Sequence, residues 1–175
     1  MTTIRRFKCE DVFKYANVNL DYYTETFHFP FYFEYLAKWP NLCYTAKNCN
    51  GRCEGYLIGK VEGKDEKHHG HLTAITVSRE FRRIRLSERL MYWLRQISEE
   101  SNGYYVDLFV RKSNDAATRM YHKLDYVVYR EILEYYSSNK ENAYDMHLAL
   151  PRDVNKKSII PLPKPISVDE ADDLN

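Results

Sequence analysis

Apolar and polar residues are grouped in short blocks along most of this chain, and the spacing within a block predicts a helix or a strand. Between Leu86 and Ile97 the apolar residues recur every three or four positions, which is typical of a helix that buries one face. Tyr104–Val110 is almost continuously apolar, as expected for a strand that is covered on both faces. Asn48–Gly51 separates two further apolar runs, and its Asn-Gly dipeptide indicates a tight hairpin turn.

The same patterns, followed along the whole chain, predict about seven strands and about four helices. The predicted strands are Thr3–Phe7, Leu42–Lys47, Gly55–Glu62, His71–Val77, Tyr104–Val110, Tyr126–Glu134 and Tyr144–Leu148. The predicted helices are Cys9–Ala16, Phe31–Lys38, a helix from Leu86 that ends near Asn102 and Gly103, and Asn114–Lys123. The order strand, helix, strand, helix implies parallel pairing in the middle of a mostly antiparallel sheet, so we predict an α/β protein of the α+β type.

Composition narrows the class of protein. With 175 residues and 44% hydrophobic content, the chain is long enough for one domain with a full core. Its 26 basic and 25 acidic residues give a net charge of +1, which argues against a nucleic-acid coat or a membrane-binding polycation. No apolar run approaches the ~20 residues of a membrane span, and the first residues lack the apolar stretch of a signal peptide. We therefore expect a soluble intracellular protein that binds neither membrane nor nucleic acid directly.

The composition changes at Pro151. Residues 151–175 contain no aromatic residue and no Gly, but they hold four of the six Pro, and their end is acidic. We predict a folded domain at residues 1–150, followed by a Pro-rich, acidic-ended C-terminal tail at residues 151–175. Two alternatives stay open for this tail: Ile159–Leu162 straps it onto the domain or a partner, or the tail is disordered.

The segment Thr73–Glu88 carries the clearest chemical signal, because a strand there leads through a loop into the start of a helix. Such a loop presents unpaired backbone N–H groups at the positive end of the helix dipole, which is an arrangement that binds phosphate. The alternative is a solvated basic helix start that is paired with Glu80 and Glu88. Five arginines crowd this segment and its first helical turn: Arg79, Arg82, Arg83, Arg85 and Arg89.

A second group of residues could be interpreted as a metal site. Cys43, Cys49 and Cys53 precede the run His68–His71, and these residue types are common metal ligands. However, two cysteines flanking a tight hairpin turn do not have the spacing of a zinc knuckle. We expect no metal here.

Two motifs in this sequence resemble those of GNAT-fold acetyltransferases. Arg82-x-x-Arg85-x-Ser87 stands where that family carries its Q/R-x-x-G-x-G/A pyrophosphate loop, and Asn114–Tyr126 is similar to its N-x-x-A-x-x-x-Y-x-x-x-G-[FY] segment. Arg85 and Asp125 replace two family glycines, so we expect both to accept, or locally shift, a left-handed conformation. A finer resemblance, to catalytic subunits of the NatB amino-terminal acetyltransferase, rests on segments that include Asn19–Asp21, Gly70–Ala74, Tyr105–Arg111, Glu134–Ser137, Ala143–Met146 and Lys156–Pro163.

The resemblance implies a GNAT fold, with a mixed, mostly antiparallel sheet, and an enzyme that uses acetyl-CoA as co-substrate. It implies direct acetyl transfer, in a ternary complex, to the α-amino group of protein N-termini that begin Met-Asp, Met-Glu, Met-Asn or Met-Gln. It also implies a cytoplasmic heterodimer with a large helical-repeat auxiliary subunit, acting on nascent N-termini at the ribosome. Since an α-amine has a pKa of about 7.7–8.0, against about 10.4 for Lys, such an acceptor needs only modest base catalysis.

The resemblance assigns roles to particular residues. Tyr121 is the candidate acid for the leaving thiolate, and His71 is the candidate base, directly or through water. His71 has an alternative as a strand histidine satisfied by the sheet, and Asn114 has one as a helix N-cap. The candidate cofactor-binding residues are Ile75, Thr76, Val77, Arg82, Arg83, Ile84, Arg85, Leu86, Ser87, Asn114 and Tyr121.

The peptide side is predicted in the same way. Tyr135 and Tyr136 have ordinary strand packing as an alternative, because neighbouring strand residues face opposite sides. The candidate substrate-binding residues are Glu25, Phe27, His71, Thr73, Asn114, Tyr135 and Tyr136. The candidate docking residues for the auxiliary subunit are Val12, Phe13, Tyr32, Tyr35, Leu36 and Trp39.

Two other functions stay open. One is a GNAT enzyme with a different acceptor, either a lysine side chain or a small amine. The other is a non-enzymatic RNA-binding module built from the arginine cluster and surface aromatic residues.

Overall fold

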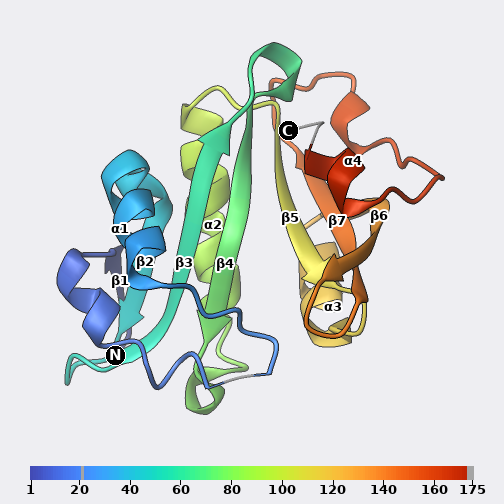
Figure 1. Ribbon diagram of the computed structural model, residues 1–175. Coiled ribbons are helices and arrows are strands. Elements are labelled where there is room, and N and C mark those ends of the chain that lie inside the picture. Colours follow the sequence, from blue (N-terminus) through green and yellow to red (C-terminus); the bar gives the residue numbers. More distant parts are fainter. Residues whose placement is uncertain (21, 173–175) are drawn as a thin grey trace. The chain divides into compact units, whose positions relative to one another are not determined.

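The computed structural model describes residues 1–20 and 22–172 of the chain. Seven strands form one mixed sheet in the order β1-β2-β3-β4-β5-β7-β6, which confirms the predicted fold class (Figure 1). Among the described residues, no helix combines the length and the apolar character needed to cross a membrane. Asp21, the last residue of the Asn19–Asp21 motif, and residues 173–175 of the predicted tail lie outside the described residues.

All seven predicted strands are present, with ends shifted by a few residues. They are β1 (Thr3–Arg6), β2 (Cys43–Lys47), β3 (Cys53–Glu62), β4 (His69–Val77), β5 (Tyr105–Arg111), β6 (Val127–Tyr136) and β7 (Glu141–Ala149). The α-helices of the described residues are α1 (Phe29–Lys38), α2 (Leu86–Glu100), α3 (Asp115–Lys123) and α4 (Val168–Asp172). Short 3-10 helices are η1 (Cys9–Phe13), η2 (Pro40–Leu42), η3 (Asp65–Lys67), η4 (Arg79–Phe81) and η5 (Lys157–Ile159).

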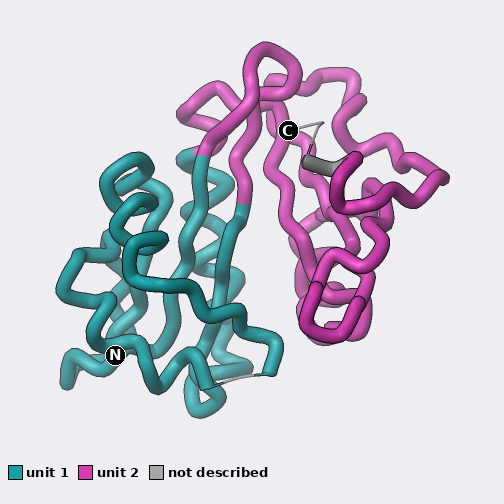
Figure 2. The backbone as a smooth tube through the Cα atoms, viewed as in Figure 1, with its two compact units in different colours: residues 1–60, 72–97 teal, residues 61–71, 98–175 magenta. Residues whose placement is uncertain are grey.

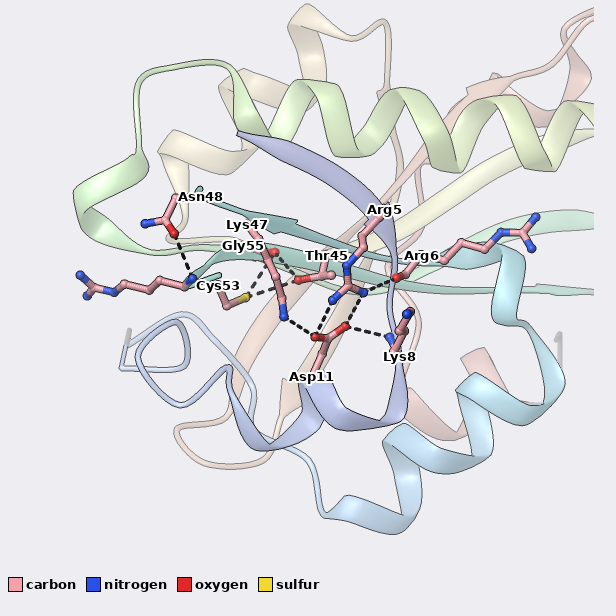
Figure 3. A network of polar contacts seen from close by, with 10 residues as sticks. Arg5, Arg6, Lys8, Asp11, Thr45, Lys47, Asn48, Cys53 and Gly55 are labelled. Carbon is pink, nitrogen blue, oxygen red and sulfur yellow. Dashed lines mark hydrogen bonds and ion pairs between the residues drawn. The ribbon is translucent and has the colours of Figure 1, made fainter. Parts of the chain in front are cut away.

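The predicted helix Cys9–Ala16 is wrong, because only the 3-10 helix η1 forms there. The buried carboxylate of Asp11 explains the tight turn (Figure 3). It accepts hydrogen bonds from the Lys8 N–H at 2.9 Å and from the Arg5 guanidinium at 2.8 and 2.9 Å. It also forms an ion pair with Lys47 Nζ on β2 at 2.5 Å. Asp11 thus fixes η1 against β1 and β2.

Helix α4 was not predicted, although its start has a recognisable signal. The Glu170 N–H donates to Ser167 Oγ at 3.3 Å, and the Ser167 N–H donates to Glu170 Oε2 at 3.0 Å. This reciprocal pair is a capping box, and the Ser-x-x-Glu spacing in the sequence predicts it.

The chain divides into two compact units (Figure 2). Residues 1–60 and 72–97 form unit 1, and residues 61–71 and 98–175 form unit 2. The predicted boundary between residues 1–150 and residues 151–175 stays a prediction.

Unit 1 has an aromatic core. Tyr32 and Tyr56 are fully buried, and Tyr15 packs against both, with ring centroids 5.0 and 5.5 Å away. Their polar tips are satisfied inside the protein: the Tyr56 hydroxyl donates to Asn19 Oδ1 at 2.8 Å and lies 3.4 Å from the Tyr32 hydroxyl. Several of the 16 tyrosines therefore serve as core residues with internal hydrogen bonds.

Because of this core, the docking prediction is wrong for three of the six residues. Val12, Tyr32 and Tyr35 are buried within unit 1 and cannot present a surface to a partner. Phe13 is 68% exposed, and its ring contacts Phe29, which is 49% exposed. Leu36 and Trp39 are partly buried against the same core.

Unit 2 contains the antiparallel strands β5, β7 and β6. A row of four aromatic rings crosses it, because each ring stacks on the next. His69 stacks on Tyr105 at 4.6 Å, Tyr105 on His147 at 4.7 Å, and His147 on Tyr129 at 4.0 Å, with all three interplanar angles at or below 14°. The row fixes the register of these strands through side chains as well as through the backbone.

The described part of the C-terminal tail is strapped onto unit 2. The Leu162 N–H donates to Tyr129 O at 2.6 Å, and the Ile166 N–H donates to Glu131 O at 3.1 Å. The Leu133 N–H donates back to Ile166 O at 2.8 Å. Disorder, the alternative prediction for this tail, is therefore wrong for residues 151–172.

The Asp11 network yields a stability prediction. Asp11→Asn removes the charge that two cations share, and the free energy of unfolding should fall by about 2–3 kcal/mol, measured by urea denaturation. Burial alone would raise the pKa of Asp11, but hydrogen bonds from Arg5 and Lys47 hold that pKa below its ordinary value. The deficit of the variant should thus be complete above about pH 4 and should shrink as the pH falls through the folded-state pKa.

A matched control is Glu34→Gln. Glu34 pairs with Lys38 at 2.6 Å on the surface of α1, where both side chains are more than half exposed. This variant should lose less than about 0.5 kcal/mol. If Asp11→Asn costs no more than Glu34→Gln, the network does not stabilise the fold.

Candidate active site

Strand β4 leads into the arginine-rich loop within unit 1. Thr76, near the end of β4, is buried, and its Oγ1 lies 2.9 Å from Thr24 Oγ1. The Arg82 side chain returns to this strand, because its Nε donates to Val77 O at 3.0 Å. This hydrogen bond holds the start of the loop against the end of β4. After the loop, α2 begins with the buried Leu86.

Two loop residues adopt a left-handed conformation, and one of them, Arg85, is at the position where the family resemblance predicts it. Arg83 has φ 67° and Arg85 has φ 60°. Left-handed residues in a turn are typical of nests, in which successive backbone N–H groups point toward a common anion. The side chains of Arg83, Ile84 and Arg85 are exposed, with Arg85 at 83%, so they are not needed in the core. Arg85 thus accepts the backbone conformation of the glycine that it replaces.

Helix α3 in unit 2 places Asn114 and Tyr121. Asn114 is the N-cap, and its Oδ1 accepts the Ala117 N–H at 3.2 Å, which confirms the structural alternative for this residue. Tyr121 is 4% exposed, and burial raises its pKa well above the ordinary tyrosine value. The Tyr121 hydroxyl consequently keeps its proton at neutral pH and can act as a hydrogen-bond donor. After the helix, Asp125 has φ 67°, as expected for a residue in the family's glycine position.

His71 forms a close pair with a buried carboxylate in unit 2. Its Nδ1 lies 2.9 Å from Asp107 Oδ1, and both residues are buried. Burial alone would raise the pKa of Asp107, but the neighbouring His71, His69 and His147 hold it well below its usual range. Asp107 is therefore an anion, and the His71 Nδ1 carries the proton of this hydrogen bond.

Asp107 is the residue that sequence reasoning missed. It interrupts Tyr104–Val110, which the pattern predicts as an apolar strand covered on both faces. A lone carboxylate in such a strand has to be paired, and this is a signal that points to a buried functional group.

Of the two late tyrosines of unit 2, Tyr135 is linked to this pair through Phe109. The Phe109 ring contacts His71 at 5.3 Å and Tyr135 at 5.0 Å, so the structure joins two candidate substrate residues through one aromatic ring. Tyr136 packs under the Arg111 guanidinium at 3.8 Å. Both tyrosines are half-buried, so each has strand packing as well as an accessible part.

The candidate peptide residues of unit 1 lie on two elements. Thr73 is half-buried on β4, and its Oγ1 donates to the Tyr35 hydroxyl at 3.1 Å. Glu25 is exposed in the segment before α1. Phe27 stacks on Phe31 at 4.0 Å, and this contact orders the segment.

The described residues do not support the predicted alternative of a cysteine–histidine metal site. Cys43 and Cys53 are buried and Cys49 is exposed, and within residues 1–20 and 22–172 no cluster of three or more metal-binding side chains includes a cysteine. Burial raises the pKa of Cys43 to about 12, which keeps its thiol neutral.

Two clusters of His and carboxylate side chains do have donor atoms within 4.8 Å of one another. In each cluster one histidine nitrogen already faces a carboxylate: His71 Nδ1 lies 2.9 Å from Asp107, and His147 Nε2 lies 2.9 Å from Asp145. The two clusters are Glu62, His69 and His71, and Asp107, Asp145 and His147.

Comparisons with known proteins agree with this geometry. The model of the acetyltransferase (GNAT) family matches residues 13–126. N-alpha-acetyltransferase 20 of Dictyostelium discoideum is 57% identical, over 98% of this chain and 99% of that protein. The NAA20 catalytic subunit of the N-terminal acetyltransferase B complex of Arabidopsis thaliana is 53% identical, over 97% and 98%. The crystal structure of Chaetomium thermophilum Naa20 with a bisubstrate analogue has a TM-score of 0.92 at 35% identity, over 97% of this chain and 98% of that one.

The chain belongs to the acetyltransferase (GNAT) family and, within it, to the catalytic subunits of N-terminal acetyltransferase B. It is an N-terminal acetyltransferase, as the sequence motifs predicted.

The left-handed Arg85 yields a second prediction. Arg85→Gly and Arg85→Ala remove the same charge, but only alanine keeps a Cβ in the left-handed region. Arg85→Gly should therefore be more stable than Arg85→Ala, by about 1 kcal/mol in urea denaturation. Equal stabilities would mean that residue 85 relaxes out of the left-handed conformation in solution.

Proposed function

We propose that this chain transfers the acetyl group of acetyl-CoA to the α-amino group of protein N-termini that begin Met-Asp, Met-Glu, Met-Asn or Met-Gln. The observation that carries this proposal is the 53% identity to a NatB catalytic subunit over almost the full length of both proteins. The bisubstrate analogue in the Chaetomium relative supports a ternary complex in which the amine attacks the thioester directly.

The proposed reaction uses His71 as base and Tyr121 as acid. The amine nitrogen forms a bond to the thioester carbon, and the carbon–sulfur bond breaks. One proton leaves the nitrogen for Nε2 of His71, directly or through a water, and the thiolate receives a proton or a hydrogen bond from the Tyr121 hydroxyl. Solvent then restores the protonation states of His71 and Tyr121. Because Tyr121 holds its proton firmly, stabilisation of the thiolate by hydrogen bonding is its main contribution.

The cofactor roles are proposed residue by residue. Backbone groups of Ile75–Val77 receive the pantetheine arm, and the loop Arg82–Ser87 receives the pyrophosphate at the start of α2. Asn114 caps α3 and also contacts the cofactor. The left-handed Arg83 and Arg85 support this assignment, because their conformation exposes backbone N–H groups to an anion.

The peptide roles are proposed likewise. Glu25, Phe27, Tyr135 and Tyr136 line the path of the first residues of the peptide. His71 and Thr73 hydrogen-bond the acidic or amide second residue, and Asn114 also contacts the substrate.

The setting in the cell is the last part of the proposal. Residues 1–150 act as the acetyltransferase domain, with residues 151–175 as an appended tail. The chain works in the cytoplasm as one half of a heterodimer with a large helical-repeat auxiliary subunit. This complex meets nascent N-termini at the ribosome.

Acetyl transfer to a peptide panel tests the proposal. Peptides that begin Met-Asp, Met-Glu, Met-Leu and Ser are compared with a peptide whose only free amine is an internal Lys, with and without the auxiliary subunit. We expect transfer that is selective for Met-Asp and Met-Glu. Transfer to the lysine peptide alone would indicate the other acceptor class, and salt-dependent RNA binding without acetyl-CoA binding would indicate the binding module.

Tyr121→Phe tests the proposed acid. The variant keeps the buried ring but removes the hydroxyl, so kcat on the Met-Asp peptide should fall by about a hundredfold while KM changes little. Tyr126→Phe is the matched control, since its ring contacts Tyr121 at 5.9 Å and it has no proposed chemical role. Equal losses in the two variants would assign Tyr121 to packing alone.

A further inference from the structure

His69 is a buried histidine that has no role in the proposed mechanism. It is 2% exposed, and its Nδ1 lies 2.6 Å from the backbone carbonyl of Lys67. A carbonyl oxygen only accepts hydrogen bonds, so Nδ1 must carry a proton. The other ring nitrogen, Nε2, then determines the charge of the ring.

Nε2 of His69 lies between two carboxylates. It is 3.5 Å from Asp107 Oδ1 and 3.6 Å from Glu62 Oε1, and it has no hydrogen bond to either. A bare lone pair at this place would face two negative oxygens, whereas an N–H group is attracted to both. Burial alone would lower the pKa of His69, but Glu62 and Asp107 together raise it. Two carboxylates thus favour the protonated form of the His69 ring.

Asp107 in turn is shared by two histidines. Its Oδ1 is 2.9 Å from Nδ1 of His71 and 3.5 Å from Nε2 of His69. The Phe109 ring, which lies edge-on to His71 at 5.3 Å, restricts rotation of the His71 imidazole. With Nδ1 bound to Asp107, Nε2 is the nitrogen of His71 that is left for chemistry.

The other charged groups near Asp107 on β7 and β6 are paired with one another. Asp145 Oδ1 lies 2.9 Å from His147 Nε2, and Asp145 Oδ2 accepts from Arg130 Nε at 2.8 Å. His147 Nδ1 also lies 2.7 Å from Ser158 O in the tail. His147 also helps to lower the pKa of Asp107, whereas His69, with Glu62 beside it, approaches Asp107 from β4.

We propose that Asp107 is a positioning residue for the acetyl-transfer base: it holds His71 through Nδ1 and presents Nε2 to the α-amine, and His69 competes with His71 for the charge of Asp107. Glu62 also faces His69 and so leaves part of the Asp107 charge to His71. This inference rests on the proposed role of His71 as base. The carboxylate of Asp107 remains ionised throughout, so no proton is relayed through it.

The arrangement predicts opposite effects of two substitutions on the same histidine. Asp107→Asn removes the anion that holds Nδ1 of His71 and leaves His69 nearby. His69→Gln removes the second histidine on Asp107, so the charge of Asp107 should act on His71 more strongly. A purely structural role would weaken the enzyme in both variants without this difference in sign.

The test is the pH dependence of kcat with a Met-Asp peptide, on the full chain assembled with its auxiliary subunit. In Asp107→Asn the acidic half-point of the profile should move to lower pH and the plateau should fall about ten- to a hundredfold, with KM little changed. In His69→Gln the half-point should move to higher pH. Asp65→Asn is the matched control, since it removes one charge from an exposed residue of the same unit and should leave the profile unchanged.

A second measurement does not depend on activity. In nitrogen-15 spectra of labelled protein at alkaline pH, neutral His71 should be protonated at Nδ1 in the wild type and in Asp107→Asn, whose side-chain oxygen can still accept. Asp107→Ala should shift the proton to Nε2. A wild-type His71 protonated at Nε2 would overturn the proposal, as would half-points that move in the same direction in the two charge variants.

The role of His71 as base and the role of Asp107 as positioning residue can be tested separately. If His71→Ala retains full kcat while the spectra show Nδ1–H on His71, then His71 is not the base and the positioning role falls with it. If His71→Ala abolishes transfer but Asp107→Asn leaves kcat and the profile unchanged, the proposed function stands and the positioning role is wrong. Loss of transfer in His71→Ala, together with a lowered plateau in Asp107→Asn and opposite shifts in Asp107→Asn and His69→Gln, supports both roles.

Discussion

A carboxylate buried inside a strand is the constraint around which unit 2 is arranged. Burying the Asp107 anion without partners would cost several kcal/mol, so its neighbours have to compensate it. Histidines on β4 and β7 provide positive charge, and the stacked row His69, Tyr105, His147 and Tyr129 keeps two of them in place. This face of the sheet therefore carries polar side chains in place of apolar ones. His71 is one of them, and its contact with Asp107 fixes its position.

Local patterns predicted most of the fold. Alternation and apolar runs located every strand, and the Asn-Gly turn located the hairpin, because these signals depend only on neighbouring residues. The failure at Cys9–Ala16 has the opposite origin, since η1 is fixed by an ion pair between Asp11 and Lys47, which are far apart in the sequence. Asp107 was missed for the same reason: its partners come from another strand, and the apolar residues around it gave a stronger signal than its own charge.

Backbone geometry explains why two substituted glycines do not disqualify the loop and helix motifs. Arg85 and Asp125 both have positive φ, the conformation that glycine would adopt most easily. The chain therefore keeps the path of the loop and accepts a conformational cost of about 1 kcal/mol at each position. A motif written as residue types can therefore miss an anion-binding loop of this kind. The feature that binds the anion is the direction of the backbone N–H groups, which several residue types can provide.

The tail has a consequence for association between molecules. Strand β6 is the last strand of the sheet, and its outer edge would offer free backbone groups to a strand of another molecule. The tail occupies part of that edge through Leu162 and Ile166. The residues that alternate with them, Pro161, Pro163 and Pro165, have no N–H to offer. The covering segment closes one edge without creating another, so the sheet cannot readily grow into a fibre from this side.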